Sequence, residues 1–167
     1  IGGGIKAPGA SNFSVADNQI IGEIAAGSSW KFVRNRVQGN VSFLTQAEVY
    51  RNLISGQVSM QCACGPHIWY FVGNTMVAPA GFDQALLVVG GDNIAVANNL
   101  FVWQGEKWAP YFAIEEIAGN FDPSMVANNA FAGFDSGDGA LYLNEATSSL
   151  ASVMQLNTLA DLPPAAP

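Results

Sequence analysis

The segment Ile94–Gln104 reads IAVANNLFVWQ, two short runs of strand-forming residues joined by Asn98 and Asn99. Asparagine adopts left-handed backbone angles more readily than most residues, and tight two-residue loops require such angles. The segment therefore predicts a β-hairpin with Asn98 and Asn99 in its loop. The turn at 90–93 precedes the segment and ends another apolar run, Ala85–Val89.

The same pattern extends over most of the chain. Short runs rich in Val, Ile, Phe, Tyr and Trp alternate with Gly, Asn, Asp and Pro, which is typical of strands separated by turns. We expect strands at 13–15, 20–24, 30–33, 41–43, 58–62, 68–72, 76–78, 85–89, 94–97, 100–104, 111–117 and 140–143. Many short strands predict an all-β protein with a β-sandwich or jelly-roll-like core. We find no internal repeat in the sequence.

One short α-helix is expected near residues 46–54. Thr45 and Glu48 have the spacing of a capping box, in which each side chain accepts a hydrogen bond from the other residue's backbone N–H. Leu44 and Val49 have the spacing of the accompanying hydrophobic staple, and Gly56 follows as a terminator.

The chain of 167 residues has the size of one domain. Residues 1–11 contain Gly or Pro at five of the first nine positions, which predicts a flexible N-terminal arm. Residues 159–167 predict a Pro-rich C-terminal arm, and residues 12–158 form the single β-rich domain between the two arms. The arm residues that we expect to contact neighbouring subunits are Ile1, Ile5, Pro8, Leu159, Leu162 and Pro163.

Charged residues make up only 11% of the chain, whereas about a quarter is usual, and the net charge is −7. Six basic residues are too few for a nucleic-acid-binding surface, so nucleic acid is not an expected partner. The apolar runs are much shorter than the roughly 20 residues that cross a bilayer, so membrane insertion is not expected either.

Two groups of residues are weak candidates for metal binding. Cys62, Cys64 and His67 supply ligand types that suit zinc or copper, but a structural zinc site needs a fourth ligand. Asp135 and Asp138 lie in an acidic, glycine-rich segment that resembles part of a calcium loop, although such segments are more often turns. We therefore expect no metal and no cofactor.

His67 is the only histidine, and thus the only side chain whose ordinary pKa lies near neutrality. No nucleophile motif surrounds the serines or cysteines that could act with it. The sequence therefore predicts a protein that is not an enzyme.

Aromatic residues give one further functional hint. Trp69, Trp103, Trp108 and Tyr111 lie in or near expected strands, where exposed rings could stack on sugars. Core packing explains most such residues without a binding role.

Few charges, two apolar arms and a β-rich core without a catalytic motif favour a structural subunit that assembles with copies of itself. The leading expectation is a virus or phage virion protein, such as a capsid, decoration or spike component, located in the virion. One alternative is a subunit of an extracellular filament or surface layer. Another is a carbohydrate-binding β-sandwich module.

Overall fold

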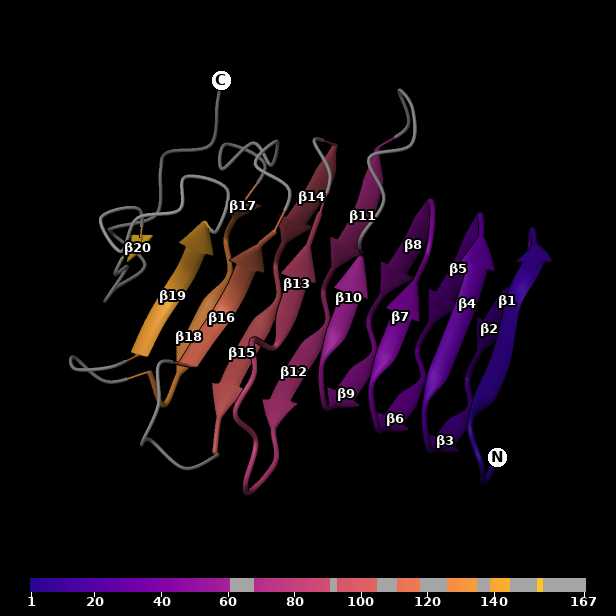
Figure 1. The fold of residues 1–167 in the computed structure, drawn as a ribbon, viewed down its shortest axis with the longest axis horizontal. Coiled ribbons are helices and arrows are strands. Elements are labelled where there is room, and N and C mark those ends of the chain that lie inside the picture. Colours follow the sequence, from indigo (N-terminus) through magenta and orange to yellow (C-terminus); the bar gives the residue numbers. More distant parts are fainter. Residues whose placement is uncertain are drawn as a thin grey trace.

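The structure, a computed structural model, describes residues 1–60, 68–90, 93–104, 111–117, 126–134, 139–144 and 153–154, with the backbone alone for 111, 112, 116, 139–144 and 153–154. In these residues the chain forms a parallel β-helix (Figure 1). It winds in successive coils, and each complete coil contributes one strand to each of three sheets. We name the sheets face 1, face 2 and face 3, in the order in which the chain enters them.

Face 1 consists of β1 (Ile5–Ser11), β4 (Ile24–Ser28), β7 (Val41–Phe43), β10 (Val58–Met60), β13 (Leu87–Val89), β16 (Tyr111–Glu116), β19 (Gly139–Asn144) and β20 (Val153–Met154). Face 2 consists of β2 (Ser14–Ala16), β5 (Trp30–Val33), β8 (Ala47–Tyr50), β11 (Trp69–Val72), β14 (Ile94–Ala97) and β17 (Val126–Ala127). Face 3 consists of β3 (Gln19–Ile21), β6 (Arg36–Gln38), β9 (Leu53–Ser55), β12 (Thr75–Ala78), β15 (Leu100–Trp103) and β18 (Ala130–Ala132). Among these strands, only β19 and β20 pair in an antiparallel manner.

The core lies inside the coils and is built from rows of apolar side chains. Successive residues of a strand point to opposite sides of its sheet, so every second residue points inward. On face 2, an inward row of buried residues runs along the helix axis through paired positions: Val15, Phe32, Val49, Phe71, Val96 and Val126. Burial of each such side chain contributes about 1.5–3 kcal/mol, which makes this interior the main source of stability.

The turns between face 2 and face 3 share one conformation. In each turn a residue with positive φ precedes an asparagine, as Arg51 (φ 56°) precedes Asn52 and Asn98 (φ 56°) precedes Asn99. The asparagines from the second coil onward are almost completely buried: Asn35, Asn52, Asn74, Asn99 and Asn129. A left-handed residue turns the chain sharply enough for the next strand to start a new face.

The buried asparagines form a hydrogen-bonded ladder along the helix axis. The backbone N–H and the Nδ2 of Asn52 both donate to Oδ1 of Asn74, each at 2.9 Å. Nδ2 of Asn74 donates to the carbonyl oxygen of Val49 at 2.9 Å, in the preceding coil, and also to Oδ1 of Asn99. Because a buried amide without partners is costly, this arrangement specifies asparagine at each such turn.

The parallel sheets show that the expected β-sandwich or jelly roll is wrong. The hairpin expected at Asn98 and Asn99 is wrong for the same reason, because β14 and β15 belong to different faces and do not pair. Asn98 does have the left-handed φ that its residue type predicts. A left-handed turn is required both in a hairpin loop and at a corner of a β-helix, so the local pattern could not distinguish them.

The helix expected near residues 46–54 is also wrong, since β8 and β9 occupy this region. Ala47 and Val49 are buried whereas Glu48 is exposed, an alternation with the period of a strand. The hydroxyl of Thr45 is buried and has no hydrogen-bond partner in the part of the chain that the structure describes. Pairing of β8 with strands on both sides overrides the weak local preference of the capping sequence.

The N-terminal residues expected to form a flexible arm are also placed differently. Residues 5–11 form β1, which pairs with β4, and the backbone of residues 1–4 lies along β3 through hydrogen bonds to Ile21. The expected C-terminal arm, residues 159–167, lies outside the described residues.

The fold contains an internal repeat, so the expectation of no repeat is wrong. Ile24, Val41 and Val58 are paired neighbours on face 1 and lie 17 residues apart. The later coils are longer, and successive ladder asparagines from Asn52 onward are separated by 22, 25 and 30 residues. The larger number of residues between successive asparagines conceals the period after the third coil.

Candidate binding surface on face 2

The metal-binding candidates Cys62, Cys64, His67, Asp135 and Asp138 lie outside the described residues. Within the described part of the chain, no group of three or more His, Cys, Asp or Glu side chains could hold a metal ion. The described residues also contain no helix that is long and apolar enough to span a membrane.

The expected sugar-stacking platform does not come together from the tryptophans. Trp69 and Trp103 are 2% and 4% exposed and belong to the core, so neither ring is available for a sugar. Trp108 lies outside the described residues, and only the backbone of Tyr111 is described, in β16.

The expected assembly residues are placed only at the N-terminal end. Ile1 is 60% exposed, and its amino group donates to the carbonyl oxygen of Gln19 at 2.8 Å. Ile5 packs partly buried against the core, whereas Pro8 is exposed on β1. Leu159, Leu162 and Pro163 lie outside the described residues.

The outward surface of face 2 carries an ordered set of side chains that the sequence did not single out. Its middle row is mainly apolar and consists of Ala16, Val33, Tyr50, Val72, Ala97 and Ala127. One flanking row consists of Ser14, Lys31, Glu48, Tyr70 and Ala95. The turn residues Asp17, Arg34, Arg51, Gly73, Asn98 and Asn128 form the other flank, at the corner with face 3.

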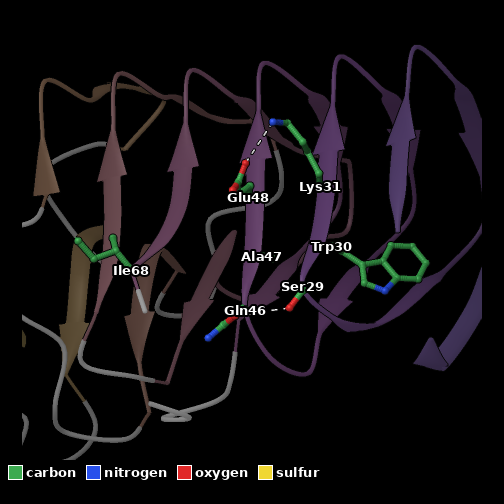
Figure 2. Close-up of a pocket in the computed structure, with 7 residues that line it drawn as sticks. All are labelled: Ser29, Trp30, Lys31, Gln46, Ala47, Glu48 and Ile68. Carbon is green, nitrogen blue, oxygen red and sulfur yellow. Dashed lines mark hydrogen bonds and ion pairs between the residues drawn. The ribbon is translucent and has the colours of Figure 1, made fainter. Parts of the chain in front are cut away.

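A hollow of about 200 Å³ opens at the first flanking row (Figure 2). Lys31 and Glu48, from neighbouring strands, form an ion pair across it with Nζ and Oε2 3.4 Å apart. At the other end of the hollow, the Ser29 hydroxyl donates to Oε1 of Gln46 at 3.5 Å. The side chain of Ile68, which is 45% exposed, also lines the hollow. The hollow thus combines charged, amide and apolar groups.

Two tyrosines from neighbouring strands lie together on the outward surface of face 2. The rings of Tyr50 and Tyr70 are stacked, with their centroids 6.1 Å apart and an interplanar angle of 28°. Burial raises the pKa of the Tyr50 phenol above its usual value of 10.0, and the nearby charge of Glu48 raises it further. The Tyr50 hydroxyl therefore stays protonated at neutral pH and can donate as well as accept hydrogen bonds.

An ion pair occupies the first two positions of the corner row. Nε and Nη2 of Arg34 donate to the two carboxylate oxygens of Asp17, at 2.7 and 2.6 Å. These hydrogen bonds lower the pKa of Asp17 below its usual value of 3.8 and raise the pKa of Arg34 above its usual value. Arg51 occupies the next position and forms no ion pair with any described residue.

The alternation of residues in 30–33 and 47–50 could have revealed these rows. Lys31 and Val33 point outward from β5, while Glu48 and Tyr50 point outward from β8, at the same spacing of 17 residues. The expected helix at 46–54 concealed the second pair, and without the repeat the two strands could not be aligned.

Comparisons of the chain with protein-family models, curated proteins and solved structures find no match.

Proposed function

We propose that the protein binds a linear polysaccharide, which lies on face 2 along the axis of the β-helix. The carbohydrate-binding alternative from the sequence thus becomes the leading one, on a β-helix instead of a sandwich and with different residues. The observation that supports it is the three-row arrangement of face 2, with an apolar middle row between two polar flanks.

The chemistry of this arrangement matches that of a sugar chain. A pyranose ring has apolar C–H faces and hydroxyls around its rim. Val33, Tyr50 and Val72 offer contacts for the apolar faces. Lys31 and Glu48 on one flank, and Arg51 on the other, offer hydrogen bonds to the rim.

The geometry favours a polymer over a small molecule. Neighbouring strands lie about 4.8 Å apart. Each coil therefore adds one residue to each of the three rows, at an interval comparable to the length of one sugar unit. The hollow of about 200 Å³ is below the roughly 300–1,000 Å³ of usual small-molecule pockets, and it suits a single ring of a longer chain. Repeat proteins commonly use such extended surfaces for elongated ligands.

A polysaccharide-binding assay with matched variants tests this proposal. Tyr70→Ala and Val72→Asn should each weaken binding of the polysaccharide that the wild type binds about tenfold. Tyr70 belongs to the first flanking row and Val72 to the middle row, and both lie on β11, an inner strand of face 2. Val77→Asn is the control, because Val77 belongs to the same coil and points outward from face 3 with similar burial. Equal loss of binding in the control, or no binding of neutral or acidic polysaccharides by the wild type, would contradict the proposal.

Self-association is a second proposal, and face 3 favours it. Its outward positions on β9, β12, β15 and β18 carry no charge and include Leu53 and Leu100, each 38% exposed. A patch of four strands covers about 250 Å² at the usual strand spacing and rise. This area is well below the roughly 800 Å² per partner of a stable interface, so face 3 could supply only the centre of one.

The structural-subunit expectation, whether in a virion or in a filament, depends on this self-association. Light scattering over a range of concentrations tests it. A defined oligomer that dissociates in a Leu53→Glu/Leu100→Glu variant would support assembly through face 3, and a monomer at all concentrations would contradict it.

A further inference from the structure

The charges of the first coils are divided in a way that leaves two arginines without an ionic partner among the described residues. Residues 1–60 contain five of the six basic residues of the chain and three of its thirteen acidic residues, hence a local net charge of +2 within a chain of −7. Each of the three acids is paired with a base: Glu23 with Lys6, Glu48 with Lys31, and Asp17 with Arg34. Arg36 and Arg51 remain, and neither forms an ion pair with a described residue.

The two remaining arginines lie at the same corner of the β-helix. Arg51 is the turn residue between face 2 and face 3 in the third coil. Arg36 begins β6 just after the equivalent turn of the second coil, and its partner in register is Leu53, two residues after Arg51. Both side chains are exposed, so the surplus positive charge of this region is concentrated beside the polar flank of face 2.

Gly73 leaves room for the Arg51 side chain to extend along this corner. A Cβ atom at Gly73 would lie 3.6 Å from Cγ of Arg51, which shows that the arginine stem lies over the turn of the following coil. Arg34 differs, because its guanidinium already makes two hydrogen bonds to Asp17. Arg51 can therefore offer its planar set of donors to an external group, and a carboxylate fits that geometry with two parallel hydrogen bonds.

We infer that the polysaccharide bound on face 2 is acidic and carries carboxylates as uronate units, which Arg51 and Arg36 bind at the corner. This inference rests on the proposed function. A neutral glycan would leave both guanidinium groups without an ionic partner, whereas a carboxylate on successive sugar units would meet one at each of two neighbouring coils. The small number of basic residues disfavours a nucleic acid, which needs many phosphate contacts.

The test compares a polyuronate with the same polymer after methyl esterification, which removes the charge and keeps the sugar backbone. Polygalacturonate and its methyl ester serve as the pair, with alginate as a second polyuronate. Calorimetric titration of the full chain should show at least tenfold tighter binding of the charged polymers, and this preference should decrease as salt is added.

Matched variants connect that preference to the two arginines. Arg36→Gln/Arg51→Gln should reduce polyuronate affinity at least tenfold and leave affinity for the ester within twofold. Lys6→Gln removes a positive charge from face 1 and should leave both affinities within twofold. Arg51→Lys, which keeps the charge and loses the planar donor set, should retain part of the preference, and unchanged melting temperatures would show that all variants fold.

The outcomes separate this inference from the proposed function. If polymer and ester bind equally well, or if the double variant keeps the preference, the uronate inference is wrong while polysaccharide binding stands. If neither polymer nor any neutral glycan binds, both proposals are wrong.

Discussion

At the scale of single residues, the buried asparagines are held in place by several hydrogen bonds each. The Asn74 side chain receives hydrogen bonds from the backbone and the amide of Asn52 and gives hydrogen bonds to Val49 and Asn99. Asn74→Ala should lower the free energy of unfolding by about 2–4 kcal/mol, because it leaves buried donors without acceptors. Urea unfolding measures this change.

A surface asparagine provides the matched control. Oδ1 of Asn40 accepts one hydrogen bond from the backbone of Gln57, at 2.9 Å, outside the buried ladder. Asn40→Ala should therefore cost about 1 kcal/mol or less. If both substitutions cost the same, the ladder does not have the role that we assign to it.

The Asp17–Arg34 pair gives a prediction on pH. Because the pKa of Asp17 is lowered in the folded protein, the pair stabilises the fold above the ordinary carboxyl pKa of 3.8, and this contribution is lost as the pH falls through the lowered value. The melting temperature of the wild type should thus exceed that of Asp17→Asn at neutral pH, by a small margin because the pair is exposed. The margin should shrink as the pH falls below the ordinary carboxyl pKa of 3.8 and through the lowered value; a margin that grows on acidification would contradict this assignment.

At the scale of elements, the corner between face 3 and face 1 depends on stacked glycines. Gly22, Gly39 and Gly56 occupy equivalent turns 17 residues apart, and Gly39 has φ of 142°. A Cβ atom on Gly39 would overlap the carbonyl oxygen of Gly22 in the preceding coil. Successive coils can approach closely at this corner only if the residue is glycine.

Gly39→Ala should therefore destabilise the protein by about 2 kcal/mol or more, through the clash and the unfavourable φ together. Gly9→Ala is the control, since a Cβ there meets no atom within 4 Å, and it should change stability by no more than about 0.5 kcal/mol. Thermal unfolding of both variants measures the difference, and equal stabilities would show that the glycine stack is dispensable.

The elements that could be predicted were the individual strands with strong local patterns. The expected strands at 30–33, 41–43 and 94–97 are confirmed as β5, β7 and β14. Composition alone does not show whether neighbouring strands run parallel or antiparallel, so correct strands do not distinguish a sandwich from a β-helix.

The sequence repeat would have shown which strands lie next to one another in the fold. Turn residues recur after 17 residues, as in Gly39 and Gly56 and in Asn35 and Asn52. Glycine and asparagine are common in turns of every kind, however, and the spacing changes after the third coil. The binding rows of face 2 depend on aligning these coils, so they could not be recognised from single strands. What the sequence did indicate, a β-rich chain with few charges, does not identify a surface.

At the scale of the whole molecule, the three faces differ in chemistry. In the described residues, face 2 and its corner carry ion pairs, tyrosines and an unpaired arginine, whereas face 3 is uncharged from β9 to β18. The β-helix holds each of these surfaces in register over several coils, which an isolated strand or loop could not do. Ligand binding and self-association are thus assigned to different faces and can be disrupted separately.

The measurement that tests the central claim most directly is a nuclear magnetic resonance titration of the isotope-labelled protein with a uronate oligosaccharide. Binding along face 2 should shift the signals of Lys31, Glu48 and Tyr70, on three successive coils, while those of Val77 and Leu100 on face 3 stay unchanged. Shifts that are confined to face 3 or to face 1, or an absence of shifts at saturating oligosaccharide, would contradict the account.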